Sequence, residues 1–107
     1  TKTFTMGVDD GDGDKFKIGT TAIGTNTRLT IDSAGLVGIG TDTPVSTLTV
    51  NGLVNLKNYT VATLPAGTRG DIAYVTDALA PAFLTIIVGG GAVVTPVFYN
   101  GVNWVAM

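Results

Sequence analysis

The chain has 107 residues, of which 45% are hydrophobic and only 13% charged, and its net charge is −2. A typical soluble domain carries about 25% charged residues, so part of the apolar excess is expected to lie between subunits. The sequence lacks Glu, His and Cys, which excludes disulfides, thiolate chemistry and imidazole metal ligation, and it has no basic run that would favour nucleic acid as a partner. We therefore expect no enzyme activity, no catalytic residue, no metal and no cofactor.

The chain begins with a predicted β-hairpin. Residues 3–8 and 15–18 alternate polar and apolar side chains, as half-buried strands do, and an Asp- and Gly-rich loop at 9–14 joins them. Carboxylates at 10, 12 and 14 are spaced like the first ligands of an EF-hand calcium loop, but Lys15 stands where that motif needs Gly and Thr21 where it needs Glu. A solvated turn is therefore favoured over a calcium site.

Further strands are predicted between residues 28 and 50. Residues 28–31 and 36–40 flank a turn closed by Gly35, and residues 47–50 alternate in the same way. Strands this short bury too little apolar surface to form a free-standing sheet, so the same strands of neighbouring chains are expected to cover them. Together with the strand at 15–18, these segments supply the candidate core shared between subunits: Phe16, Ile18, Leu29, Ile31, Val37, Ile39, Leu48 and Val50.

The sequence changes character near residues 56–67, and we predict a first part at residues 1–60 and a second part at residues 61–107. In the second part, residues 71–75 are predicted to form a strand. The wholly apolar residues 83–88 are predicted to form another strand, buried on both sides. This part is expected to be a small β-sandwich or barrel-like unit.

The last predicted element is a β-hairpin closed by Asn100 and Gly101, a dipeptide that favours a two-residue type I′ turn. Such a turn places three pairs opposite one another: Tyr99 with Val102, Val97 with Trp104, and Phe98 with Asn103. Aromatic rings and amide groups are what a shallow sugar site uses, rings for stacking and amides for hydroxyl groups. The candidate receptor contacts are therefore Tyr99, Asn100, Asn103 and Trp104, although core packing is favoured for Trp104.

The uncharged end of the chain does not predict a membrane span. No charged residue follows Asp77, which gives this region the hydropathy of a membrane segment. However, Pro81, Pro96 and the Gly run at 89–91 would interrupt a helix, and no Lys or Arg flanks the segment. We therefore expect no membrane insertion.

Residues 35–50, GLVGIGTDTPVSTLTV, resemble a motif of bacteriophage tail fibres and related trimeric fibres, of the form VGIGTxxPxxxLxV. Residues 6–32 are similar to the stretch that often precedes this motif in the same fibres. In such proteins the motif frequently leads into a chaperone or peptidase domain that is cleaved off after trimerisation. Here the chain ends instead with a GGGAxxxPVxxxGxxW layout, which resembles short terminal domains of marine phage fibre proteins.

The resemblance implies an all-β, intertwined homotrimeric fibre shaft, like a triple β-helix or β-prism, followed by a small tip, in a tail fibre of a virion. The number of chains comes from the resemblance alone. It also implies that Gly38 and Gly40 pack near the three-fold axis or turn a corner, and that Pro44 fixes the next turn. The implied function is structural support and recognition of a host cell-surface carbohydrate or protein. The alternatives are a trimerisation cap that binds nothing, a polysaccharide-cleaving tailspike domain, and a bacterial adhesin fragment.

Overall fold

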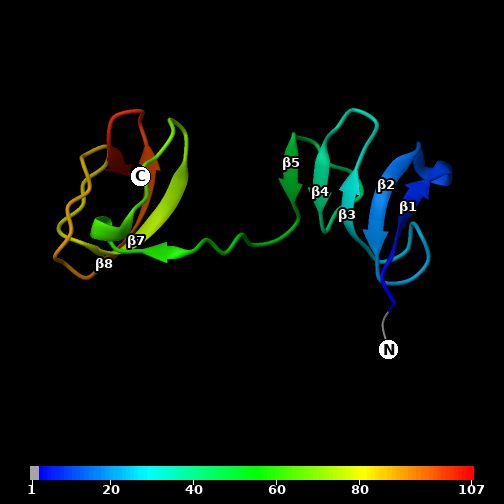
Figure 1. Ribbon diagram of the computed structural model, residues 1–107, viewed down its shortest axis with the longest axis horizontal. Helices are drawn as coiled ribbons and strands as arrows, with labels where there is room; N and C mark the ends of the chain where they lie inside the picture. Colours follow the sequence, from blue (N-terminus) through cyan, green and yellow to red (C-terminus); the bar gives the residue numbers. More distant parts are fainter. Residues whose placement is uncertain (1–2) are drawn as a thin grey trace. The chain divides into compact units, whose positions relative to one another are not determined.

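The computed structural model describes residues 3–107, and within this range the chain is built from strands, turns and loops (Figure 1). It divides into two compact units, residues 1–54 and 55–107, each with one mixed sheet. The helical segments described are two short 3-10 turns, η1 (Asp10–Asp12) and η2 (Val61–Thr63). Among residues 3–107, no helix is long and apolar enough to cross a membrane. The all-β prediction is confirmed.

Unit 1 is a five-stranded sheet whose strands lie side by side in chain order (Figure 1). The strands are β1 (Thr5–Asp9), β2 (Lys15–Gly19), β3 (Thr27–Ile31), β4 (Val37–Ile39) and β5 (Leu48–Val50). The first four run antiparallel, as both predicted hairpins require, and β5 runs parallel to β4. The parallel pair needs a crossover, which residues 40–47 provide.

The crossover between β4 and β5 packs directly on the sheet at Gly38. A Cβ atom at this position would lie 2.5 Å from the carbonyl oxygen of Thr41, so a side chain would push the crossover away. Gly40, with a φ of 70°, turns the chain into the crossover, and Pro44 is buried within it. The close approach that the resemblance assigned to a three-fold axis is thus made at Gly38 by the same chain.

Unit 2 is a four-stranded sheet in the order β6 (Asn58–Tyr59), β7 (Ile72–Ala78), β8 (Val93–Tyr99) and β9 (Trp104–Ala106). β6 runs parallel to β7, and the other neighbours are antiparallel. The sequence placed the division of the chain after residue 60, whereas the β6–β7 pairing joins residues 58–59 to unit 2. Apart from Pro44, the buried apolar side chains among the described residues belong to unit 2: Ala73, Val75, Ala78, Ile87, Val97, Val105 and Ala106.

Residues 83–88 do not form the predicted strand with two buried sides. They lie beside β9, joined to it by the isolated bridge between Ile86 and Val105 and by three backbone hydrogen bonds, which involve Leu84, Thr85 and Ile87. Ile87 is the only residue of the segment that is buried. Leu84 has a φ of 61°, which interrupts the extended backbone, and the Phe83 side chain is 76% exposed. Unit 2 has one four-stranded sheet, and residues of η2 and of the loops pack against its core.

The predicted two-residue turn of the last hairpin is wrong as well. Tyr99 lies opposite Trp104, which leaves a four-residue loop at 100–103. The Asn100 side chain stabilises this longer loop, because its Oδ1 accepts hydrogen bonds from the N–H groups of Val102 and Asn103 at 2.9 and 2.8 Å. The register differs from the predicted one by two residues, so each side chain keeps its predicted face.

Candidate functional site

All eight residues predicted to form a core between subunits lie on one face of the unit 1 sheet. The opposite pairs are Phe16 with Ile31, Ile18 with Leu29, Leu29 with Ile39, Ile31 with Val37, Val37 with Leu48, and Ile39 with Val50. β1 extends the row with Met6 opposite Ile18 and Val8 opposite Phe16. Directly opposite residues point to the same side of a sheet. Met6, Val8 and the eight predicted residues therefore form one surface, the unit 1 apolar face.

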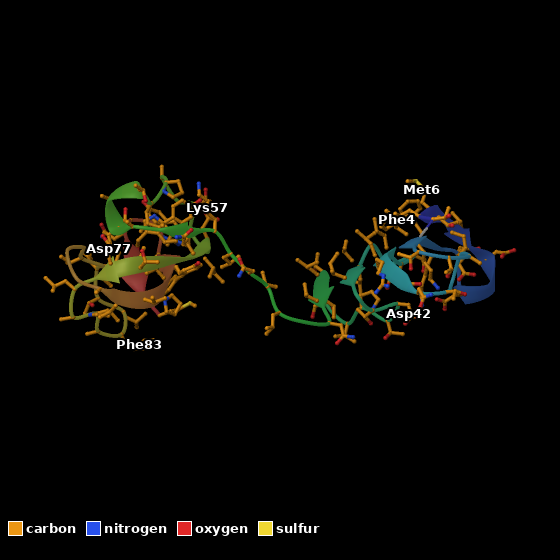
Figure 2. All side chains as sticks on the ribbon, turned by 90° about the horizontal axis from the view of Figure 1, so that it is seen from below. Phe4, Met6, Asp42, Lys57, Asp77 and Phe83 are labelled. Carbon is orange, nitrogen blue, oxygen red and sulfur yellow. The ribbon has the colours of Figure 1, made fainter. Side chains whose placement is uncertain are left out.

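The unit 1 apolar face is open to solvent in the single chain. Met6, Val8 and Leu48 are at least 60% exposed, Ile31 and Ile39 are each 38% exposed, and the other five side chains are half-buried. Figure 2 shows the side chains of Phe4 and Met6 on one side of unit 1 and Asp42 on the opposite side. An apolar surface that runs across all five strands without a charged residue is characteristic of an interaction surface.

The opposite face of the unit 1 sheet is polar and buried. Its central row pairs Lys17 with Thr30 and Thr30 with Gly38, and all three are buried. Loops of the same chain cover this face: Ile23 approaches Gly7, and Thr41 lies over Gly38. The buried side of the unit 1 sheet is therefore the polar side, whereas in an ordinary monomeric domain the apolar side is buried.

Two lysine ammonium groups on the polar face pair with carboxylates of the Asp-rich loop. Lys17 Nζ lies 2.9 Å from an Asp9 carboxylate oxygen and 2.5 Å from an Asp12 oxygen, and Lys15 Nζ lies 3.0 Å from the other Asp12 oxygen. The hydrogen bond from Lys17, followed by the one from Lys15, lowers the pKa of Asp12 below its ordinary value. The hydrogen bond to Asp12 in turn raises the pKa of Lys17, although burial opposes this rise. Both groups therefore stay charged around neutral pH.

The same face contains a buried hydroxyl group without a hydrogen-bond partner, that of Thr30. Its Oγ1 is buried and has no hydrogen-bond partner among residues 3–107. Leaving a buried hydroxyl unpaired costs about 1–3 kcal/mol, so Thr30→Val, which keeps the shape, is expected to raise the free energy of unfolding by about 1 kcal/mol. Urea unfolding measures this, with Thr47→Val at an exposed site as a control that changes it by less than about 0.5 kcal/mol. A loss of stability in Thr30→Val would show that the hydroxyl has a partner.

The candidate receptor contacts lie at the β8–β9 loop, where the two aromatic residues hold the loop in place. The Tyr99 and Trp104 rings meet edge to face, with centroids 5.5 Å apart. Tyr99 Oη donates a hydrogen bond to the carbonyl oxygen of Val102 at 2.9 Å, and Trp104 Nε1 donates to that of Pro65 at 3.0 Å. Trp104 also packs against the unit 2 core, in agreement with the role favoured for it.

The side-chain amides of Asn100 and Asn103 differ in how many of their hydrogen-bonding groups have no partner within the chain. Asn100 is exposed, but its side-chain oxygen bonds within the loop. Asn103 is half-buried rather than exposed, and its side chain makes no hydrogen bond among the described residues. Asn103 therefore keeps the most hydrogen-bonding capacity of the four candidates.

Two residues that support this loop were not predicted. Arg69 Nε donates to the carbonyl oxygen of Asn100 at 3.1 Å across 31 residues of sequence. A Cβ atom at Gly67 would lie 2.5 Å from the Tyr99 ring, so this glycine lets the 65–71 segment pack on the aromatic pair. No local pattern signals contacts between residues so far apart in the sequence.

No protein-family model, curated protein or solved structure matches this chain. Over residues 3–107 the surface has no pocket, and no group of three or more Asp, Glu, His or Cys side chains could hold a metal ion. The unit 1 apolar face and the β8–β9 loop are open surfaces, accessible to contact with another macromolecule.

Proposed function

We propose that the chain is a structural segment of a homotrimeric fibre of the kind found in bacteriophage tails. In this proposal, unit 1 belongs to the shaft of an extracellular fibre on a virion, and unit 2 contacts a carbohydrate or protein on the host surface. The observation that carries the proposal is the exposed unit 1 apolar face. The resemblance of residues 35–50 to a motif of trimeric fibres supports the number of chains and the viral context.

Burial of the unit 1 apolar face supplies the driving force for assembly. Fully burying one exposed Val, Leu, Ile, Phe or Met side chain contributes about 1.5–3 kcal/mol. Among the described residues of unit 1, Pro44 is the only apolar side chain that the single chain buries. Below about 70–80 residues a single hydrophobic core rarely supplies more than about 3–5 kcal/mol, and natural mini-proteins add disulfides, a metal or oligomerisation. The chain has no Cys, so association is a direct way to obtain that stability.

Other copies of the same chain suit this face because it carries no charge. Around a symmetry axis each side chain lies near its own copies, so a charged residue would face like charges. The charged residues of β1 and β2, Asp9, Lys15 and Lys17, all lie on the opposite side of the sheet. Apolar side chains can meet their copies without such repulsion.

A lysine on the unit 1 apolar face is expected to abolish assembly. The single chain can accept Ile39→Lys, because the site is 38% exposed and the ammonium can reach water. In a trimer, the substitution brings three ammonium groups together. Light scattering at micromolar concentration is expected to give the mass of three chains for the unchanged protein and of one chain for Ile39→Lys. Ser33→Lys, in an exposed turn, is the matched control and keeps the trimer mass.

The proposal fails if the unchanged protein has the mass of one folded chain at micromolar concentration. It also fails if Ile39→Lys and Ser33→Lys give the same mass. A mass of two chains would retain the role of the apolar face in assembly and remove the trimer.

A trimerisation cap without receptor binding is the second candidate, and one observation favours it. Three of the four candidate contacts use polar groups to hold the β8–β9 loop, which leaves Asn103 as the main free amide. If the loop recognises a host polysaccharide, Asn103→Ala is expected to weaken binding about tenfold, which corresponds to about 1.4 kcal/mol. Thr68→Ala, at an exposed site, is expected to leave it unchanged. Binding on an array of host glycans measures both, and the cap predicts no binding by any variant.

A further inference from the structure

Asn100 and Gly101, which begin the β8–β9 loop, place a nucleophile next to an amide that it can attack. Both residues are exposed, and the backbone nitrogen of Gly101 can close a cyclic imide with Cγ of Asn100. Glycine has no Cβ atom to hinder this attack. Among residues 3–107, no hydrogen bond holds the N–H group of Gly101. This nitrogen is therefore available to react with the neighbouring side chain.

The side-chain oxygen of Asn100 lies where two donors would stabilise a negative charge. Asn100 Oδ1 accepts hydrogen bonds from the N–H groups of Val102 and Asn103 at 2.9 and 2.8 Å. When a nucleophile attacks Cγ, this oxygen becomes the negatively charged atom of the tetrahedral intermediate. N–H groups that already point at such an oxygen stabilise the intermediate. The two bonds that hold the loop in shape therefore also favour attack at Cγ.

Arg69 acts on the nucleophile through the peptide group that contains it. Arg69 Nε donates to the carbonyl oxygen of Asn100 at 3.1 Å, and this carbonyl is conjugated with the Gly101 nitrogen. A cation on the oxygen stabilises the negative charge that forms when the nitrogen loses its proton. Glycine is needed here, because a Cβ atom on Gly101 would lie 2.6 Å from Arg69 Nε.

We propose that Asn100 is a modification site, at which the folded loop promotes conversion of the side-chain amide into a carboxylate. Hydroxide takes the proton of the Gly101 nitrogen, which forms a bond to Cγ, and Nδ2 gains a proton from water and leaves as ammonia. Water then opens the cyclic imide at either carbonyl carbon, which gives aspartate or isoaspartate at position 100. The net change is the addition of water and the loss of ammonia, and nothing is oxidised or reduced. This inference does not rest on the proposed function.

Conversion would change both the charge and the length of the β8–β9 loop. A carboxylate at position 100 places a negative charge near the Arg69 guanidinium. The isoaspartate form adds a methylene group to the main chain. The loop would therefore exist in several chemical forms, whose proportions change with the age of the protein.

A second Asn-Gly pair, Asn51 and Gly52, is an internal control because it lacks both supporting contacts. It is also exposed. Asn51 Nδ2 donates to the carbonyl oxygen of Gly40 at 3.1 Å, but within residues 3–107 its Oδ1 accepts no hydrogen bond. In the same part of the chain, no cationic side chain bonds its main-chain carbonyl oxygen. Asn51 therefore reports the rate of an Asn-Gly pair without these contacts.

The full chain is incubated in mildly alkaline buffer, and mass spectrometry of its peptides follows conversion at both sites in the same sample. Asn100 is expected to convert at least about tenfold faster than Asn51 in the folded chain, because only its oxygen is held by two N–H donors. In urea the contacts are lost, and the two rates are expected to become similar. Equal rates in the folded chain, or slower conversion of Asn100, would overturn the proposal.

Two variants at Arg69 test it as a positioning residue. Arg69→Gln is expected to slow conversion of Asn100 about tenfold in the folded chain, to leave Asn51 unchanged and to have no effect in urea. Arg69→Lys keeps a cation and is expected to restore most of the rate. Lys57→Gln removes an exposed cation that contacts Tyr59 and is the matched control with an unchanged rate. If Arg69 only holds the loop in shape, Arg69→Gln would leave the rate unchanged or raise it, and its assigned role would be wrong.

Discussion

Replacing Lys17 with Met is expected to lower the free energy of unfolding by about 2 kcal/mol, because it removes the hydrogen bonds from a buried ammonium group to two carboxylates. Lys17 is 2% exposed and its ammonium lies between carboxylate oxygens of Asp9 and Asp12. Without it, these carboxylates repel each other beside the buried face of the unit 1 sheet. Urea unfolding at neutral pH and a fixed protein concentration measures the loss.

Lys15→Met is the matched control for this experiment. Lys15 also contacts Asp12, but its side chain is more exposed, so about 1 kcal/mol or less is expected to be lost. Equal losses in the two variants would show that Lys17 acts only as a surface charge. No loss in Lys17→Met would contradict the buried ammonium altogether.

Trp104→Ala is expected to destabilise unit 2 by about 3 kcal/mol, at the low end of the range for removing a large aromatic core residue. The side chain is half-buried, packs on the core cluster, meets Tyr99 edge to face and donates a hydrogen bond to Pro65. Trp104→Phe keeps an aromatic ring and loses the hydrogen bond, so a smaller loss of about 1 kcal/mol is expected. Circular dichroism during urea unfolding measures both variants without depending on tryptophan fluorescence.

The same variants distinguish core packing from receptor contact at Trp104. A stabilising residue changes the unfolding midpoint whether or not a ligand is present. If Trp104→Ala keeps the unfolding midpoint and loses binding to host glycans, the residue acts in recognition instead. The edge-to-face contact with Tyr99 would then serve to orient the ring for a ligand.

Much of unit 1 could be predicted from the period-two pattern of its sequence. The alternation around Leu29, Val37 and Leu48 located three strands to within about a residue and placed their apolar side chains on a common face. This succeeds because a strand must alternate its side chains whatever covers them. The pattern carries no information on which side the chain's own loops will cover, so the burial of Lys17 was not predicted.

The errors in unit 2 have a different cause. The apolar run at 83–88 has the composition of a buried strand, but the left-handed backbone at Leu84 interrupts it, and no feature of the run announces that change. At the last hairpin, Asn100 and Gly101 suit a tight turn, yet the Asn100 side chain bonds two N–H groups further along and favours the longer loop. The sequence therefore predicted a turn at the correct place, but with a loop two residues too short.

Because the exposed side of the unit 1 sheet is apolar and the buried side polar, the positions that tolerate substitution in a saturation mutagenesis library depend on what the library is selected for. Judged on an isolated subunit, Ile39 ranks as a permissive surface position and Thr30 as an intolerant interior one. Selection for the proposed assembly would instead reject polar residues at 39, whereas valine at 30 would be enriched in both selections, because Thr30 lies on the face that the chain's own loops cover. Sites that tolerate change would then mark where subunits do not touch.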